Sequence, residues 1–286
     1  MGDLVRAAAG GMLFGIPLLF TLEVWGIGSA TTPAAMAAVL GLTFVPVTLL
    51  VHTAGFRRSM DMRFTSVLAE SAEAVAVGVV VVTGVLFVLA EITLRTPLAD
   101  AIGKVVYEAA PFAIGAAVAS HLFERSPDAP DGDPGQSEGQ AGARAEGSAE
   151  GRGSLRGTLA DLGSTFVGAV FVGFNIAPTE EIPRLAAASS PARLLAVMGL
   201  SLLVSYGIVF QAGFRDQARR REQRGILQHP ITETAAGYLV ALVAAAAMLL
   251  FFRNLQVGDP WPLALDHIVL LGLPTAVGGA AGRLAI

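Results

Sequence analysis

The chain of 286 residues contains no cysteine and carries few charges. The lack of cysteine excludes disulfides, thiolate metal sites and cysteine nucleophiles. Charged residues make up 15% of the chain, whereas soluble domains carry roughly 25%. Hydrophobic residues reach 53% and the mean hydropathy is +0.63. This composition argues against a soluble globular protein.

Familiar catalytic and nucleic-acid-binding signatures are also missing. The sequence has no P-loop, no G-x-S-x-G and no H-E-x-x-H. The net charge is −4, and the basic residues lie in short loops, so we expect no nucleic-acid partner. His52 and His121 have no His or carboxylate partners at metal-ligand spacing. We therefore expect neither an enzyme nor a cofactor, and metal binding is left open.

What the sequence does have is a series of apolar runs of about 20 residues, long enough to cross a bilayer. They predict an all-α polytopic membrane protein with about eight transmembrane helices. The predicted spans are 4–25, 33–51, 64–89, 97–122, 155–178, 191–210, 231–252 and 261–280. Between the fourth and fifth spans, residues 124–154 are rich in Pro, Gly, Ser, Glu and Asp. Such a segment buries too little apolar surface to order itself, so it is predicted to be a disordered acidic linker.

The two sides of this linker resemble each other. Ala54-Gly55-Phe56-Arg57 recurs as Ala212-Gly213-Phe214-Arg215, 158 positions later. Glu70, Pro97 and Pro111 match residues 163 positions later, namely Glu233, Pro260 and Pro274. In the first span, Gly11, Phe14 and Glu23 match Gly168, Phe171 and Glu180 at 157 positions. We therefore predict two parallel four-span repeats, 1–123 and 155–286, related by an axis along the membrane normal.

Arginine gathers in the loops after the second and sixth predicted spans. These residues are Arg57, Arg58 and Arg63, and Arg215, Arg219, Arg220, Arg221 and Arg224. By the positive-inside rule, these loops, the linker and both termini are predicted to be cytoplasmic, in a cell inner (plasma) membrane.

The first candidate site lies at the predicted extracellular ends of the first and fifth spans. Glu23 and Glu180 lie at one depth, as a cation-attracting mouth requires. Glu181, Asn175 and Asp266 add polar groups there, and the helix is predicted to break near Pro178 and Pro183. The alternative is that the carboxylates only mark where each helix leaves the membrane.

Two further groups of ionisable residues lie in the spans. Glu70, Glu73 and Glu233 lie near the predicted cytoplasmic starts of the third and seventh spans, where helix N-capping is the alternative role. Lys104 and Glu108 are spaced as an i, i+4 pair inside the fourth span, and His267 stands at the repeat position of Lys104. They are predicted to form either a titratable middle element or a structural ion pair.

Two resemblances bear on function. The run Glu180-Glu181-Ile182-Pro183-Arg184 resembles the paired-Glu motif of intramembrane CAAX-type proteases, but the later histidine motifs of that family are absent. The stretches GGMLFGIPLLFTLEVW (residues 10–25) and NIAPTEEI (residues 175–182) resemble an uncharacterised family of prokaryotic integral membrane proteins, a domain of unknown function. This resemblance implies a membrane location and makes the two Glu motifs family features.

The leading functional hypothesis is a membrane conduit, a channel or a transporter, for a cation or protons. The competing hypothesis is a non-transporting membrane sensor or assembly protein, and an intramembrane protease is the weaker alternative. The expected partners are the lipid bilayer and the cation or proton. The small-residue helix faces could pack within one chain or between the protomers of a homo-oligomer.

Overall fold

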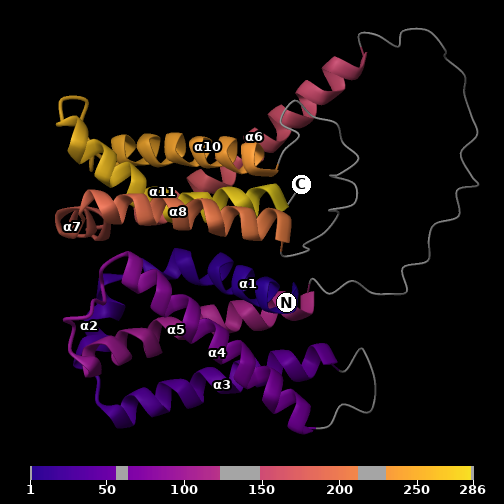
Figure 1. Cartoon of the computed structure of the whole chain (residues 1–286), viewed down its shortest axis with the longest axis vertical. Helices are drawn as coiled ribbons and strands as arrows, with labels where there is room; N and C mark the ends of the chain where they lie inside the picture. The colour runs from indigo at the N-terminus through magenta and orange to yellow at the C-terminus, as the bar shows by residue number, and fades with distance from the viewer. Residues whose placement is uncertain (1, 56–63, 123–148, 212–229, 285–286) are drawn as a thin grey trace, which may run out of the picture.

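The computed structural model describes residues 2–55, 64–122, 149–211 and 230–284, and this part of the chain is helical without strands (Figure 1). The arginines of the two basic loops and most of the predicted linker lie outside the described residues. In chain order the first half consists of α1 (Gly2–Leu19), α2 (Leu22–Ala30), α3 (Pro33–Gly55), α4 (Phe64–Val88) and α5 (Leu98–Leu122). The second half consists of α6 (Ala149–Ile176), α7 (Glu181–Ala188), α8 (Pro191–Tyr206), the π-helix η1 (Gly207–Gln211), α10 (Pro230–Phe251) and α11 (Trp261–Leu284).

The prediction of a polytopic helical membrane protein is confirmed. Among the described residues, six helices are long and apolar enough to cross a membrane, and the count reaches eight if each of two bent pairs forms one span. The bent pairs are α1 with α2, at 94°, and α6 with α7, at 88°. The second bend lies where Pro178 and Pro183 predicted it, whereas the first span was expected to be one helix. Helix α6 begins at Ala149, so the last residues of the predicted linker are helical.

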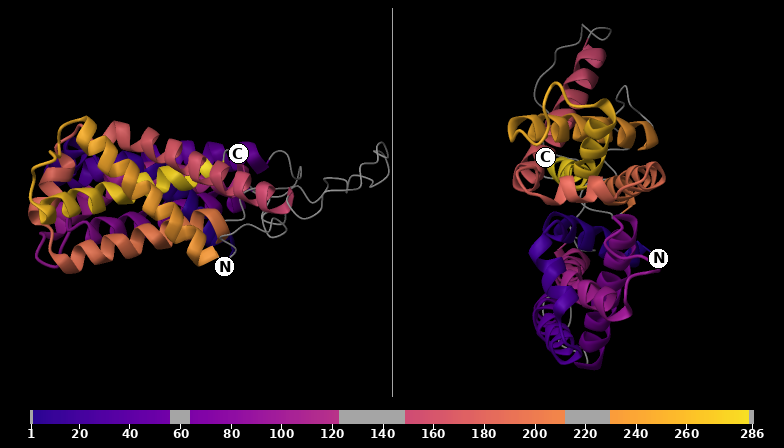
Figure 2. Two further views of the ribbon diagram at one scale, coloured as in Figure 1. Left: turned by 90° about the horizontal axis from the view of Figure 1, so that it is seen from above. Right: turned by 90° about the vertical axis from the view of Figure 1, so that its left-hand side faces the viewer.

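The long helices run side by side, and the two halves are stacked on each other (Figures 1 and 2). Helices α2 and α7 lie at the left-hand ends of the long helices in Figure 1, here called the bend end. Both chain termini lie at the opposite end, here called the terminus end. The halves therefore have the same direction, as four spans per repeat require.

Each half is built around its last helix. Helix α5 packs against α1, α2, α3 and α4, and α11 packs against α6, α7, α8 and α10. Residues 269–280 of α11 are all buried. Glycines allow close backbone approach on both central helices: a Cβ atom on Gly10 would collide with Gly115, and one on Gly168 with Gly278.

The two halves also share hydrogen-bond detail. Helices α4 and α10 are each followed, two positions after the last helical residue, by a residue with positive φ; these are Ala90 and Arg253, which are 163 positions apart. After each of these residues the chain makes an equivalent backbone hydrogen bond. Ile92 N–H donates to Leu86 O at 3.3 Å, and Leu255 N–H donates to Leu249 O at 3.2 Å. These correspondences favour duplication over chance similarity of apolar helices.

The offset of the first span needs a correction. Gly10 and Gly168 make equivalent contacts and are 158 positions apart, not 157. The bond from Thr31 Oγ1 to Ile27 O likewise recurs 158 positions later, from Ser189 Oγ to Leu185 O. Glu23 therefore corresponds to Glu181, not to Glu180. Adjacent acids allowed both alignments in the sequence, and only the packing separates them.

Helix α2 is held against α5 by a glycine contact, which gives a stability prediction. A Cβ atom on Gly28 would lie 2.8 Å from Lys104 Cα and N, both backbone atoms. We expect Gly28→Val to destabilise the protein by about 1–3 kcal/mol, because backbone atoms cannot move aside as a side chain can. Gly26 has open space around its Cβ position, so Gly26→Val is the matched control. Thermal unfolding in detergent measures both, and equal midpoints would contradict the close contact.

Candidate functional site

A charged cluster lies at the bend end of the first half, where the loop after α4 meets the start of α5. Lys104 Nζ lies 3.4 Å from Glu91 Oε2 and 3.6 Å from Asp100 Oδ1. It also donates a hydrogen bond of 3.1 Å to the backbone O of Glu91. Lys104 is buried, whereas Glu91 and Asp100 are half-buried, with 9% and 26% of their side-chain surfaces exposed. Two acids therefore surround one lysine within the apolar bundle.

The ion pair between Lys104 and Glu108, one of the two roles left open by the sequence, does not form, because Lys104 pairs with Glu91 and Asp100. Helical side chains lean toward the helix N-terminus, so Lys104 reaches back one turn to Asp100 and to the preceding loop. An acid four residues before a base is also the more favourable order. Sequence reasoning missed Glu91, because it lies outside the spans, and missed Asp100, although its i, i+4 spacing to Lys104 was a usable signal.

Glu108 lies one turn deeper in α5, and only 1% of its surface is exposed. The Trp25 side chain on α2 is a polar neighbour of Glu108, and the Gly28 contact holds α2 against α5. Glu108 Oε1 and Trp25 Nε1 are both buried, and neither has a hydrogen bond of ordinary geometry to another described residue. Unpaired ionisable groups at membrane depth are costly and are functional candidates by default. Asp100, Lys104 and Glu108 thus form one face of α5 running from the bend end into the span.

The second half has neutral side chains at most of these positions. At the repeat offset of 163, Glu91, Asp100, Lys104 and Glu108 correspond to Asn254, Leu263, His267 and Leu271. Asn254 donates a hydrogen bond to Ala177 O at the α6–α7 bend. His267 is buried, and its Nδ1 has no hydrogen-bond partner among the described residues. At these four positions, acidic side chains therefore occur only in the first half.

The remaining acids predicted at the bend end are dispersed. Glu23 and Glu180 are exposed and Asp266 is half-buried, and Asn175 donates to Phe171 O one turn back along α6. Glu181 differs from them, because it is buried and its Oε1 accepts a 3.1 Å hydrogen bond from Leu22 N–H. Leu22 is the first residue of α2, so Glu181 caps a helix of the other half. In the described ranges, no three His, Asp or Glu residues are grouped so as to hold a metal ion.

The acids predicted near the terminus end also differ from one another. Glu70 and Glu73 on α4 are exposed. Glu233 on α10 forms an ion pair with Arg283 of α11, a buried arginine that sequence reasoning did not single out as a partner. The repeat position of Arg283 is Ser120, so the first half has no arginine there for Glu70.

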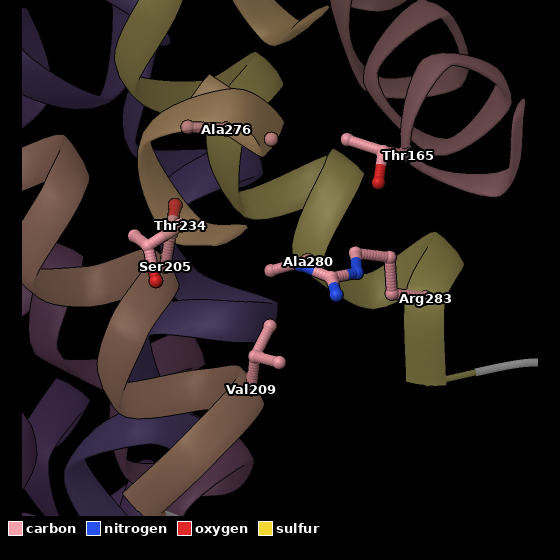
Figure 3. Close-up of a pocket in the computed structure, with 8 residues that line it drawn as sticks. Thr165, Ser205, Val209, Thr234, Ala276, Ala280 and Arg283 are labelled. Carbon is pink, nitrogen blue, oxygen red and sulfur yellow. The ribbon is translucent and has the colours of Figure 1, made fainter. Parts of the chain in front are cut away.

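A pocket with room for about one water molecule lies beside Arg283 (Figure 3). It opens among α6, α8, α10 and α11, and Figure 3 shows Thr165, Ser205, Thr234 and Arg283 around it. The hydroxyls of Thr165 and Thr234 donate to their own helices, to Asp161 O and Pro230 O. The Ser205 hydroxyl has no hydrogen-bond partner among the described residues, but the pocket is small for a solute.

One comparison with known proteins gives a match. The family model "Putative integral membrane protein (DUF2391)" matches residues 3–286. No curated protein and no solved structure matches the chain.

Proposed function

We propose that this chain, which belongs to the DUF2391 family, carries protons or another cation across the membrane and is not an enzyme. The observation that carries the proposal is Glu108, a buried carboxyl in the middle of α5 with an unbonded oxygen. Burial of an ionisable group inside a membrane bundle opposes folding. A role in ion binding accounts for this cost.

The residues between Glu108 and the bend end support a pathway. Lys104 and Asp100 lie on the same helix face at successive i, i+4 positions, and burial decreases toward the bend end. Glu91 adds a second acid beside Lys104. The cluster therefore has more negative than positive groups, which favours cations over anions. Glu23 and Glu180 add exposed carboxylates at the same end of the molecule.

Beyond Glu108, α5 becomes apolar. Phe112, Ala113, Ala116 and Ala119 are all buried on the way to the terminus end. We infer that ions reach Glu108 from the bend end only, as they would in one state of an alternating-access carrier. Pro111 next to this segment permits a change of helix geometry. We further propose that the terminus end faces the cytoplasm, because the helices that flank the arginine-rich segments 56–63 and 212–229 in the sequence end or begin there (Figure 1).

Flux measurements test the proposal. Proteoliposomes containing a pH-sensitive dye are given a voltage or pH gradient and a panel of cations, and wild type is compared with Glu108→Gln. We expect flux in wild type and a loss of at least about tenfold in the variant, because glutamine cannot exchange a proton or supply charge. The matched control is Asp259→Asn, an acid-to-amide change in the α10–α11 loop whose acceptor oxygen still serves Gln256 N–H.

The outcomes separate the proposed transporter from its main alternative. If folded wild-type protein moves no proton or cation under either gradient, the transport proposal fails. A non-transporting sensor or assembly protein then becomes the better hypothesis. Equal flux in wild type and a folded Glu108→Gln variant would remove Glu108 from the pathway.

A further inference from the structure

The two halves contact each other through non-equivalent faces. Helices η1 and α11 of the second half pack against α1, and α8 packs against α4. In the stack, α3 lies at the outer side of the first half, whereas α6 and α10 lie at the outer side of the second half (Figures 1 and 2). In such a heterologous, head-to-tail contact, two different faces meet. Each half therefore keeps exposed the face that is equivalent to the one its neighbour uses in the contact.

The first unpaired face is a stripe on α6. At the offset of 158, Ala9 and Ile16 of α1 correspond to Val167 and Phe174 of α6. Ala9 is 6% and Ile16 0% exposed, whereas Val167 is 68% and Phe174 52% exposed. Phe171 lies between them at helical spacing and is also exposed. The α1 side chains are thus buried at positions whose α6 equivalents remain open.

The second unpaired face lies on α2 and α3. On α7, Glu181, Ile182 and Leu185 are buried. Their equivalents on α2 are Glu23 and Ile27, which are exposed, and the half-buried Val24. The same difference separates α8 from α3, because Leu200 is half-buried and its equivalent Leu42 is exposed.

We propose that these two faces bind each other between copies of this chain, so that the protein forms a homo-oligomer through repeats of its internal contact. The α6 stripe of one copy receives the α2–α3 face of the next. Within one chain, Glu181 caps α2 at Leu22 N–H. Between copies, the equivalent Glu23 caps α7 at the backbone N–H of Glu180.

Lipid is the default cover for an apolar stripe in a membrane, and it would suit Val167, Phe171 and Phe174 alone. A second copy accounts for this stripe and for Glu23 together, because it also offers the Glu23 carboxylate a backbone N–H group. The complementary faces lie on opposite sides of one molecule, and their equivalents are already joined inside it. This proposal rests on the packing of the halves and is independent of ion transport.

Disulfide trapping tests the proposal, and the chain has no native cysteine. Glu23→Cys and Glu180→Cys are placed on separate chains with different tags, co-expressed and oxidised in membranes. We expect a disulfide between the two tags, and none when either variant is expressed alone. Each chain carries one cysteine, so a bond within one copy cannot produce the signal.

A bulky substitution provides the second measurement. Val167→Trp obstructs the α6 stripe and is expected to lower the crosslink yield about tenfold. Val243→Trp is the control, because Val243 is exposed and its equivalent Val80 is exposed too, outside the internal contact. A monomer by mass in lipid nanodiscs with no crosslink, or Glu23–Glu23 crosslinks alone, would overturn the proposal. Equal yields in the two tryptophan variants would also overturn it.

Discussion

Lys104→Met is expected to be among the most destabilising single changes in the first half. It leaves the carboxylates of Glu91 and Asp100 facing each other at the bend end without their shared cation. Breaking a buried ion pair by removing one partner costs about 3–5 kcal/mol, because the remaining charge is uncompensated. Thermal unfolding in detergent should show a midpoint lower by about 10 °C.

The second half suggests how this loss can be reversed. It has Asn254 and His267 at the positions of Glu91 and Lys104, and so lacks this ion pair. Lys104→Met combined with Glu91→Gln should recover most of the lost stability, since the charge and its partner are removed together. If the double variant is as unstable as Lys104→Met alone, Lys104 contributes by packing and the ion pair is not its main role.

Arg283→Met is the second large expected effect, at the terminus end of the other half. Arg283 is buried and pairs with Glu233, which is half-buried on α10. Loss of the guanidinium leaves the Glu233 carboxylate facing α11 without its cation, which again costs about 3–5 kcal/mol. The partial exposure of Glu233 favours the lower end of this range, because water screens its charge.

The double variant Arg283→Met with Glu233→Gln separates the pair from the packing of the arginine stem. We expect the double variant to be more stable than Arg283→Met, by thermal unfolding in the same detergent. Glu70→Gln is the control, because Glu70 occupies the repeat position of Glu233 but is exposed. A fall in stability on Glu70→Gln as large as that on Glu233→Gln would contradict the special role of the pair.

The sequence predicted the helices better than the contacts of the candidate site. Apolar runs of span length and the repeated Pro, Gly and Glu residues are local signals, and each is readable without knowledge of packing. The bend near Pro178 was predictable because proline interrupts helices. The bend after Leu19 has no proline at the break itself, since Pro17 lies within α1, and sequence reasoning therefore missed it.

The partners of the buried charges could not be predicted in the same way. Lys104 binds Glu91 because a loop with a positive-φ residue, Ala90, turns the chain back over α5. Glu181 caps a helix 159 residues away. Such contacts depend on how helices from distant parts of the chain pack, whereas sequence spacing only reports neighbours on one helix. The one-residue offset between Glu180 and Glu181 was ambiguous for the same reason.

The most direct test of the central proposal is whether Glu108 exchanges protons with one side of the membrane. The chain has two tryptophans, so Trp261→Phe leaves Trp25, beside Glu108, as the only one. In oriented vesicles, we expect Trp25 fluorescence to follow the pH of the bath at the bend end and not at the terminus end, and to become insensitive in Glu108→Gln. Fluorescence unaffected by pH on either side, or the same response in Glu108→Gln, would contradict the account.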